Sequence, residues 1–168
     1  ASLCGNYELL LVDDASPDDT LQLFELARLV HSNTKVFKFP RNIEYSGSLN
    51  TILSHANGNS VVFLSNDIFV TPYYFQQLFC ISESVKNAGI VRGCSNFVDN
   101  GLKPHNVNNC GALDNFDSLF SYGKERAEVY DCRSIDDPFL TGDAFLVTRS
   151  LIDEIGFIDP CFFGYFAD

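Results

Sequence analysis

The chain has 168 residues, of which 46% are hydrophobic and 14% aromatic, a composition that favours one folded domain and excludes a disordered segment. Its formal net charge is -11, and the eleven lysines and arginines are scattered along the sequence, so no nucleic-acid partner is expected. No apolar stretch approaches the roughly 20 residues that a membrane-spanning helix needs.

The six cysteines form no C-x-x-C pair and no cysteine and histidine cluster with zinc spacing. A chain of this length and apolar content does not need disulfides, so we expect free thiols; three disulfides are the alternative if the protein is secreted. The sequence contains no methionine, even at position 1, which indicates a fragment of a longer protein.

A buried strand is predicted at residues 7–12 (YELLLV), directly before the adjacent carboxylates of Asp13 and Asp14. Ser16 fits an N-cap position, which predicts a helix over residues 17–31. Since no folding rule demands two adjacent carboxylates between a strand and a helix cap, Asp13 and Asp14 are candidates for ligand binding. An Asx-turn at a tight strand-to-helix connection is the alternative.

The alternation of strands and helices then continues, with a strand at 35–39, a helix at 48–56 and a strand at 60–64. This order predicts right-handed crossovers and a largely parallel sheet whose strand ends meet at one crevice. The residues expected to converge there are Asp13, Asp14, Arg41, Asn42 and Asp67.

Asp67 follows the run SVVFLSN at residues 60–66, and a rigid strand that ends there would deliver its carboxylate to a metal ion or a sugar. Capping of the following turn is the alternative role for this side chain. Because the protein is so acidic, an anionic ligand such as a nucleotide would need a divalent cation between the carboxylates and its phosphates.

The second half of the sequence is less regular. Residues 95–140 are rich in Asn, Asp and Gly and predict the loops and antiparallel strands of a substrate pocket. Gly142 interrupts an apolar strand, where a ligand could approach the backbone closely. The remaining predictions are helices from residue 71 and at 150–155, and strands at 90–91 and 139–148. We therefore expect a single α/β domain with two halves, residues 1–94 and 95–168.

Four blocks of this sequence, in order, resemble family 2 glycosyltransferases of the GT-A fold, which have a Rossmann-like, mostly parallel sheet flanked by helices and a smaller antiparallel acceptor-side region. LLLVDDASPDDT resembles the first nucleotide-binding block, and the stretch from FPRN to FLSND resembles the run into the Asp-x-Asp motif. The TP that follows matches a helix start. The stretch from FLTGDAF to the final GYFAD resembles the acceptor block that ends in a Glu-Asp motif.

The resemblance implies transfer of a sugar from a nucleotide-sugar donor to an acceptor hydroxyl, with inversion, in polysaccharide or glycoconjugate synthesis. It implies Mn²⁺ or Mg²⁺ bound by Asp67 and a general base at Asp168 that deprotonates the acceptor. Ser65 and Ala167 stand where the family has Asp and Glu. The implied donor-binding residues are Asp13, Asp14, Arg41, Asn42 and Asn66, and the implied acceptor-side residues are Gly142 and Asp143.

The implied partners are a nucleotide-sugar and a glycan or lipid-linked acceptor, and the implied location is the cytoplasm or the inner face of the membrane. Family members begin with a strand and helix that this sequence lacks, and continue past the Glu-Asp motif. We therefore expect the strands at 7–12 and 60–64 either to pair directly or to accept a strand from a neighbouring chain, a form of self-association. A nucleotidyltransferase and a non-catalytic nucleotide- or sugar-binding domain are the alternative functions.

Overall fold

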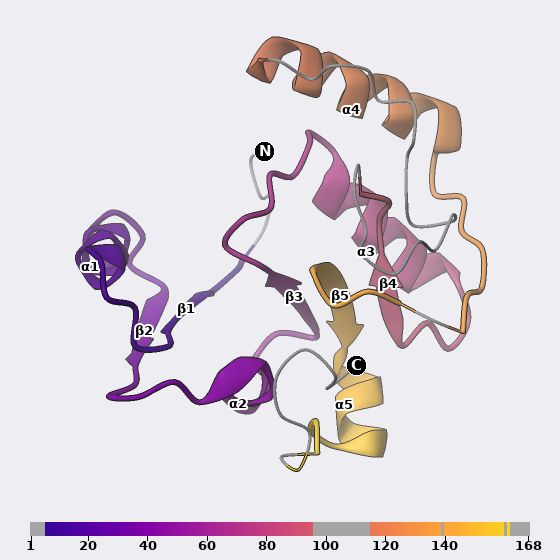
Figure 1. Cartoon of the computed structure of the whole chain (residues 1–168). Coiled ribbons are helices and arrows are strands. Elements are labelled where there is room, and N and C mark those ends of the chain that lie inside the picture. The colour runs from indigo at the N-terminus through magenta and orange to yellow at the C-terminus, as the bar shows by residue number, and fades with distance from the viewer. Residues whose placement is uncertain (1–5, 96–114, 139, 160, 162–168) are drawn as a thin grey trace.

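The computed structural model describes residues 6–95, 115–138, 140–159 and 161, and shows helices alternating with strands through most of this range (Figure 1). In chain order the elements are β1 (Leu9–Asp13), α1 (Thr20–Val30), β2 (Thr34–Lys38), α2 (Glu44–His55), β3 (Ser60–Leu64), α3 (Tyr74–Ser84), β4 (Ile90–Arg92), α4 (Phe116–Tyr130), β5 (Ala144–Thr148) and α5 (Arg149–Ile155).

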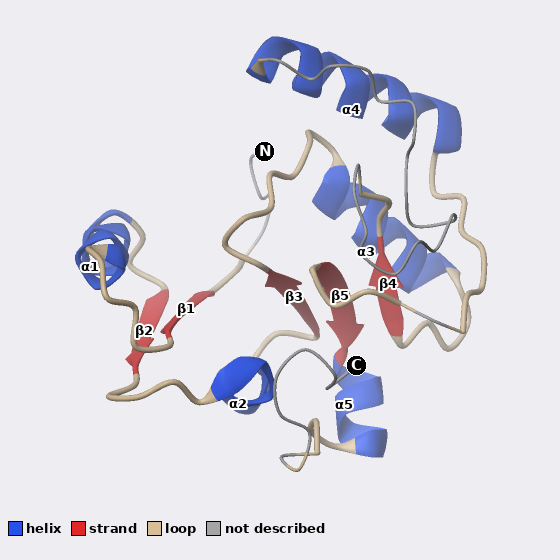
Figure 2. Ribbon diagram, viewed as in Figure 1, coloured by secondary structure: helices blue, strands red, loops and turns tan. Residues whose placement is uncertain are grey.

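The described strands form two sheets (Figure 2). β1 pairs with β2 in parallel, with Leu9 opposite Thr34 and Asp13 opposite Lys38. The other sheet is antiparallel, in the order β3-β5-β4. The α/β class is confirmed, but β3 pairs with β5 and not within a parallel sheet that includes β1.

Among the described strands, β1 and β3 do not pair with each other, so the expected direct pairing is not observed. β1 pairs along one edge with β2, and β3 along one edge with β5, which leaves one edge of each strand without a described partner. Pairing of these edges with a strand from a neighbouring chain stays a prediction.

The core lies on both faces of the antiparallel sheet, because successive side chains of β5 point to opposite faces. On one face, Val147 packs with residues of α2, β3 and α5; on the other, Leu146 packs with residues of α3 and β4. Leu78 and Leu146 are the largest fully buried side chains in the described part. The two core clusters are Leu53, Val61, Val147 and Ile152, and Leu78, Val91 and Leu146.

Several helix starts differ from the predicted ones; α3, for example, begins at Tyr74 and not at residue 71. α1 begins at Thr20 and not at Pro17: the Asp18 carboxylate accepts the Thr20 N–H (3.0 Å), whereas the Ser16 N–H donates to Asp13 (3.0 Å). α2 begins at Glu44, earlier than predicted, because the Asn42 side chain accepts the Glu44 N–H (2.6 Å). Local side-chain acceptors therefore set the starts of α1 and α2.

α4 corrects the prediction of loops and antiparallel strands over residues 95–140. It is a helix of 15 residues, and its N-cap Asn115 accepts the backbone N–H of Ser118 (2.9 Å). α4 lies beside α3 (Figure 1). Gly123 lets α4 approach the segment before α3 closely, because a Cβ at position 123 would lie 2.2 Å from the Cβ of Thr71. Among the described residues, no helix is long and apolar enough to cross a membrane.

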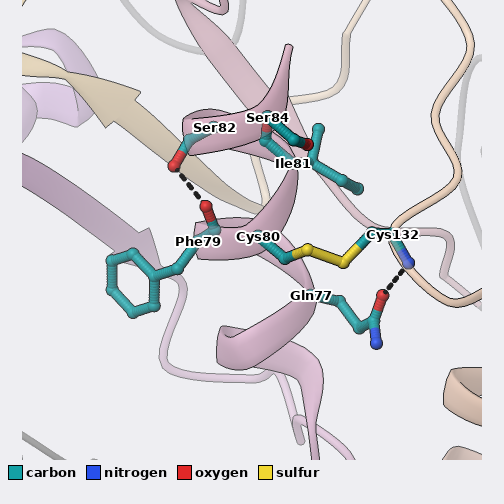
Figure 3. Close-up of a disulfide and its surroundings, with 7 residues drawn as sticks. All are labelled: Gln77, Phe79, Cys80, Ile81, Ser82, Ser84 and Cys132. Carbon is teal, nitrogen blue, oxygen red and sulfur yellow. Dashed lines mark hydrogen bonds between the residues drawn. A yellow bond between two sulfur atoms is a disulfide. The ribbon is translucent and has the colours of Figure 1, made fainter.

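A disulfide between Cys80 in α3 and Cys132, just after α4, corrects the expectation of free thiols (Figure 3). The Cα atoms of the two cysteines are 5.8 Å apart. The Gln77 side chain accepts the backbone N–H of Cys132 (2.7 Å), which fixes the same junction by a second contact. Cys94 and Cys161 form no disulfide with the described residues.

Candidate active site

The two carboxylates at the end of β1 each accept a backbone N–H. Asp13 is 3% exposed, and its Oδ1 accepts the N–H of Ser16 (3.0 Å). Asp14 is half-buried, and its Oδ1 accepts the N–H of Ile43 (2.7 Å), directly before α2. Asp13 thus forms a local turn, the role expected as the alternative to ligand binding. Asp14 instead connects the end of β1 to the start of α2.

Arg41 and Asn42 lie in the loop between β2 and α2, directly before Ile43, which donates its N–H to Asp14. Asn42 is exposed and accepts the N–H of Glu44 (2.6 Å). The guanidinium of Arg41 is exposed and makes no hydrogen bond or ion pair with the described residues. The hydrogen bond from Ile43 to Asp14 therefore places Asp14 next to the loop that carries Arg41 and Asn42.

Asn66 and Asp67 occupy a turn after β3, and both are exposed. The Ile68 N–H donates to the carbonyl of Ser65 (3.3 Å) and closes this turn. The described residues contain no group of three or more His, Cys, Asp or Glu side chains that could together hold a metal ion.

Asp143 is the centre of a polar network at the start of β5. Its carboxylate forms an ion pair with Arg92 (2.9 Å) and accepts hydrogen bonds from Ser95 Oγ and Thr141 Oγ1, both 2.9 Å. The Arg92 side chain, which also donates to the hydroxyls of Thr141 and Ser95, is 2% exposed. Sequence reasoning placed Asp143 on the acceptor side and missed Arg92, whose ion-pair partner Asp143 lies 51 positions away.

The Asp143 network is connected to the turn of Asp67 and to α2. The Ser65 N–H donates to the carbonyl of Asp143 (2.9 Å), and the Tyr45 hydroxyl in the first turn of α2 donates to the carbonyl of Gly142. The Tyr45 ring also contacts Phe63 of β3 edge-on, with ring centroids 5.5 Å apart. The structure therefore brings Asn66 and Asp67 together with Gly142 and Asp143.

Tyr74 of α3 is a further buried polar residue near this network that sequence reasoning missed. Its hydroxyl donates to the carbonyl of Ala144 (3.1 Å) and accepts the N–H of Gly93 (3.3 Å). Burial raises the pKa of Tyr74 above its usual value of 10.0, so the phenol stays protonated at neutral pH. Its role here is to hold β4 and β5 at the strand ends that border the site.

The described contacts leave the predicted residues in two groups, one at the end of β1 and one between β3 and β5. Asp13 is the last residue of β1 and Asp67 follows β3, a strand of the other sheet, and within the described residues no side-chain contact joins them. Their convergence in one crevice stays a prediction. Asp168 lies outside the described residues.

Comparisons with known proteins identify the chain's relatives. Residues 2–156 match the profile of Glycosyl transferase family 2. A stretch of 67 residues is 30% identical to the "Uncharacterized glycosyltransferase YkcC" of Bacillus subtilis (strain 168), covering 40% of this chain and 21% of that protein.

The fold is similar to that of a solved structure, mannosyltransferase PcManGT from Pyrobaculum calidifontis in complex with GDP-Man and Mn²⁺, with a TM-score of 0.57. The similarity covers 91% of this chain and 38% of that one, at 19% sequence identity. The fold resemblance expected from the sequence is confirmed. Because the profile match covers most of its length, the chain belongs to Glycosyl transferase family 2.

Proposed function

We propose that this chain is part of a glycosyltransferase that moves a sugar from a nucleotide-sugar donor to a hydroxyl of a glycan or lipid-linked acceptor, with inversion at the anomeric carbon. The observation that carries the proposal is the hydrogen bond between Ser65 and Asp143, which fixes the turn of Asp67 against the segment of Gly142. The sequence resemblance assigns these two segments to the donor and acceptor blocks, and both lie within the residues that match the family. We assign the reaction to polysaccharide or glycoconjugate synthesis in the cytoplasm or at the inner face of the membrane.

The donor-binding residues in this proposal are Asp13, Asp14, Arg41, Asn42 and Asn66. The exposed guanidinium of Arg41, which has no partner among the described residues, is suited to a diphosphate, since planar guanidinium groups bind phosphate oxygens through two parallel hydrogen bonds. Asp13 and Asp14 each have a second carboxylate oxygen that makes no hydrogen bond with the described residues, and these oxygens can accept from a base or a ribose hydroxyl.

Asp67 fits the role of a ligand for Mn²⁺ or Mg²⁺, because its exposed carboxylate makes no ion pair or hydrogen bond within the described residues. One carboxylate is enough for a cation that is also held by substrate phosphates and water. The mannosyltransferase of similar fold was solved with GDP-Man and Mn²⁺, which supports this choice of ligands. When bound, the cation would neutralise charge on the departing diphosphate.

On the acceptor side, we propose that Asp168 is the general base that takes the proton from the acceptor hydroxyl. Asp143 has a different role, because Arg92, Ser95 and Thr141 all bind its carboxylate and leave it poorly placed to move a proton. Asp143 and the Gly142 carbonyl instead shape the acceptor side through their contacts with Ser65 and Tyr45.

A thermal-shift panel of nucleoside diphosphates, each with and without Mn²⁺, tests the proposal. A ligand at about 100 times its dissociation constant stabilises a protein by about 2.7 kcal/mol, enough for a clear shift. We expect one diphosphate to stabilise the protein, and only with Mn²⁺. If none does so, the proposed donor site is wrong. If one does so and the protein that contains this chain transfers no sugar from any nucleotide-sugar of that base, the function is binding without catalysis.

A further inference from the structure

Three exposed phenylalanines form one cluster on the surface of the described part. Phe69 is 74% exposed, Phe116 60% and Phe120 46%. The ring centroids of Phe69 and Phe116 are 5.7 Å apart and those of Phe116 and Phe120 6.2 Å apart, within the range of aromatic contacts. Single exposed apolar side chains are ordinary, but several in mutual contact mark a binding surface.

The phenylalanine cluster joins the candidate donor site to α4. Phe69 comes two residues after Asp67 in the segment between β3 and α3, whereas Phe116 and Phe120 lie in the first turns of α4. α4 is fixed by the close approach of Gly123 to Thr71 and by the Cys80–Cys132 disulfide. The three rings are therefore presented by anchored elements, and Phe69 is close in sequence to the candidate metal ligand Asp67.

The chemistry of the cluster and its surroundings selects the ligand. Phenylalanine rings offer no hydrogen bond and bind through their faces, which suits the C–H face of a sugar ring. The first turn of α4 carries Asp117, Asp67 is close in sequence to Phe69, and the chain has a net charge of -11. At this cluster, away from a bridging cation, an anionic lipid surface or a phosphorylated ligand would be repelled, whereas a neutral sugar would not.

We propose that the phenylalanine cluster is an acceptor subsite that stacks against a neutral hexose ring of a glycan. This subsite rests on the proposed function, because a transferase brings its acceptor next to the donor carboxylate. It adds to that function a substrate class, neutral glycans, and the residues that bind it. The ring bound at the cluster is held by stacking, and its hydroxyls stay free.

Binding of cellotriose, maltotriose and mannotriose, measured by saturation-transfer NMR and titration on the protein that contains this chain, tests the subsite. We expect at least one of these trisaccharides to bind, and we expect Phe69→Ala and Phe116→Ala each to weaken binding roughly three- to tenfold. Phe116→Leu keeps an apolar side chain without a ring and should weaken binding as well. Phe157→Ala is the matched control, since Phe157 is 53% exposed and lies after α5.

The subsite is overturned if wild-type protein binds none of the three trisaccharides, or if the Phe69 and Phe116 variants bind them as wild type does. Co-sedimentation with phosphatidylcholine vesicles that depends on Phe69 and Phe116, without sugar binding, would show a lipid surface instead. Stabilisation by a nucleoside diphosphate with Mn²⁺ should be the same in these variants. If no nucleoside diphosphate stabilises the wild-type protein with Mn²⁺ but the trisaccharides bind, the proposed function is overturned and the subsite stands.

Discussion

The backbone N–H of Ser65 donates a 2.9 Å hydrogen bond to the carbonyl of Asp143, and this bond joins the end of β3 to the start of β5 beyond their last paired residues. The turn with Asp67 is thereby fixed to the segment that Arg92 holds through its ion pair with Asp143. Arg92 is therefore a positioning residue, because it orders a candidate metal ligand through two intermediate contacts.

Replacing Arg92 should destabilise the protein. In Arg92→Met, the Asp143 carboxylate loses its only described cationic partner. The expected loss in unfolding free energy is about 2 kcal/mol. This is below the cost of breaking a fully buried pair, because the Asp143 side chain is 25% exposed. Urea unfolding measures this loss. The double variant with Asp143→Asn should recover part of it, because no uncompensated charge remains. An Arg92→Met protein as stable as wild type would contradict the structural role of this ion pair.

Asp67→Asn should abolish stabilisation by a nucleoside diphosphate with Mn²⁺, because the variant lacks the carboxylate that would bind the cation. The unfolding free energy of the ligand-free protein should stay within about 0.5 kcal/mol of wild type, because surface substitutions without partners have small effects. Thermal shift with and without Mn²⁺ measures both quantities. Asp153→Asn, at an exposed position of α5, is the matched control and should bind as wild type does. Undiminished Mn²⁺-dependent binding by Asp67→Asn would remove the metal role from this residue.

Asp168→Asn, in contrast, should leave donor binding unchanged and lower the rate of sugar transfer, since only the proton of the acceptor hydroxyl is affected. The measurement is turnover of the intact enzyme alongside thermal shift with the nucleoside diphosphate. Equal losses of donor affinity and turnover would argue against a base.

Glu8 gives the stability a defined pH dependence. The backbone N–H of Asn57 lowers the pKa of Glu8 below its usual value of 4.5, partial burial opposes this, and Lys35 lowers it further. Because the folded-state pKa is the lower one, Glu8 stabilises the fold above about pH 4.5, and this contribution disappears as the pH falls through the folded-state pKa.

The stability difference between wild type and Glu8→Gln, measured by urea unfolding, should therefore be present at pH 7 and shrink toward zero in acid. Glu154→Gln, at an exposed position of α5, is the matched control variant. A difference for Glu8→Gln that is the same at pH 7 and in acid would mean that the contacts of Glu8 do not depend on its charge.

Replacing Cys80 and Cys132 together by serine should lower the unfolding free energy. The disulfide closes a loop with a sequence separation of 52, for which the chain-entropy relation gives up to about 4 kcal/mol. A dithiol reductant should lower the midpoint of thermal unfolding in wild type but not in the double variant, and Cys161→Ser should respond as wild type does. Equal midpoints of the oxidised and reduced wild-type protein would mean that the bridge contributes nothing.

Local sequence patterns predicted much of the fold. The run SVVFL forms β3 at the predicted residues, because its signal is local: a short apolar run directly after the turn residues Asn57 to Asn59. The α4 residues Phe116, Leu119, Phe120 and Gly123 do recur at helical spacing, but the prediction weighed the Asn, Asp and Gly content of the whole stretch and missed them. Composition was the weaker signal there.

The candidate site was predicted less completely, because its contacts join distant residues. Asp14 and Asp67 could be found as carboxylates that follow strands, but the tether of Asp14 to Ile43 depends on how the loop folds. The ion pair between Arg92 and Asp143 spans 51 positions and the contact of Tyr45 with Gly142 spans 97, and no local pattern encodes either pair. Only the tertiary fold defines such partners.

Gly123→Ala should destabilise the packing of α4, although alanine has the higher helix propensity by about 1 kcal/mol. A Cβ at position 123 would lie 2.2 Å from the Cβ of Thr71 and 2.7 Å from its hydroxyl, so α4 must move away from the segment before α3. Overpacking of this kind costs about 1–3 kcal/mol, which exceeds the gain in propensity at its upper end.

Hydrogen exchange of the α4 amides and urea unfolding measure the effect of Gly123→Ala. We expect faster exchange in α4, and we expect added Thr71→Gly to restore protection because it removes the side chain that clashes. Ser121→Ala is the control on the same helix, since Ser121 is exposed and its replacement should leave α4 protected. Because displacement of α4 also separates Phe116 from Phe69, Gly123→Ala should weaken trisaccharide binding. Unchanged exchange in α4 would show that the helix is not held at Gly123.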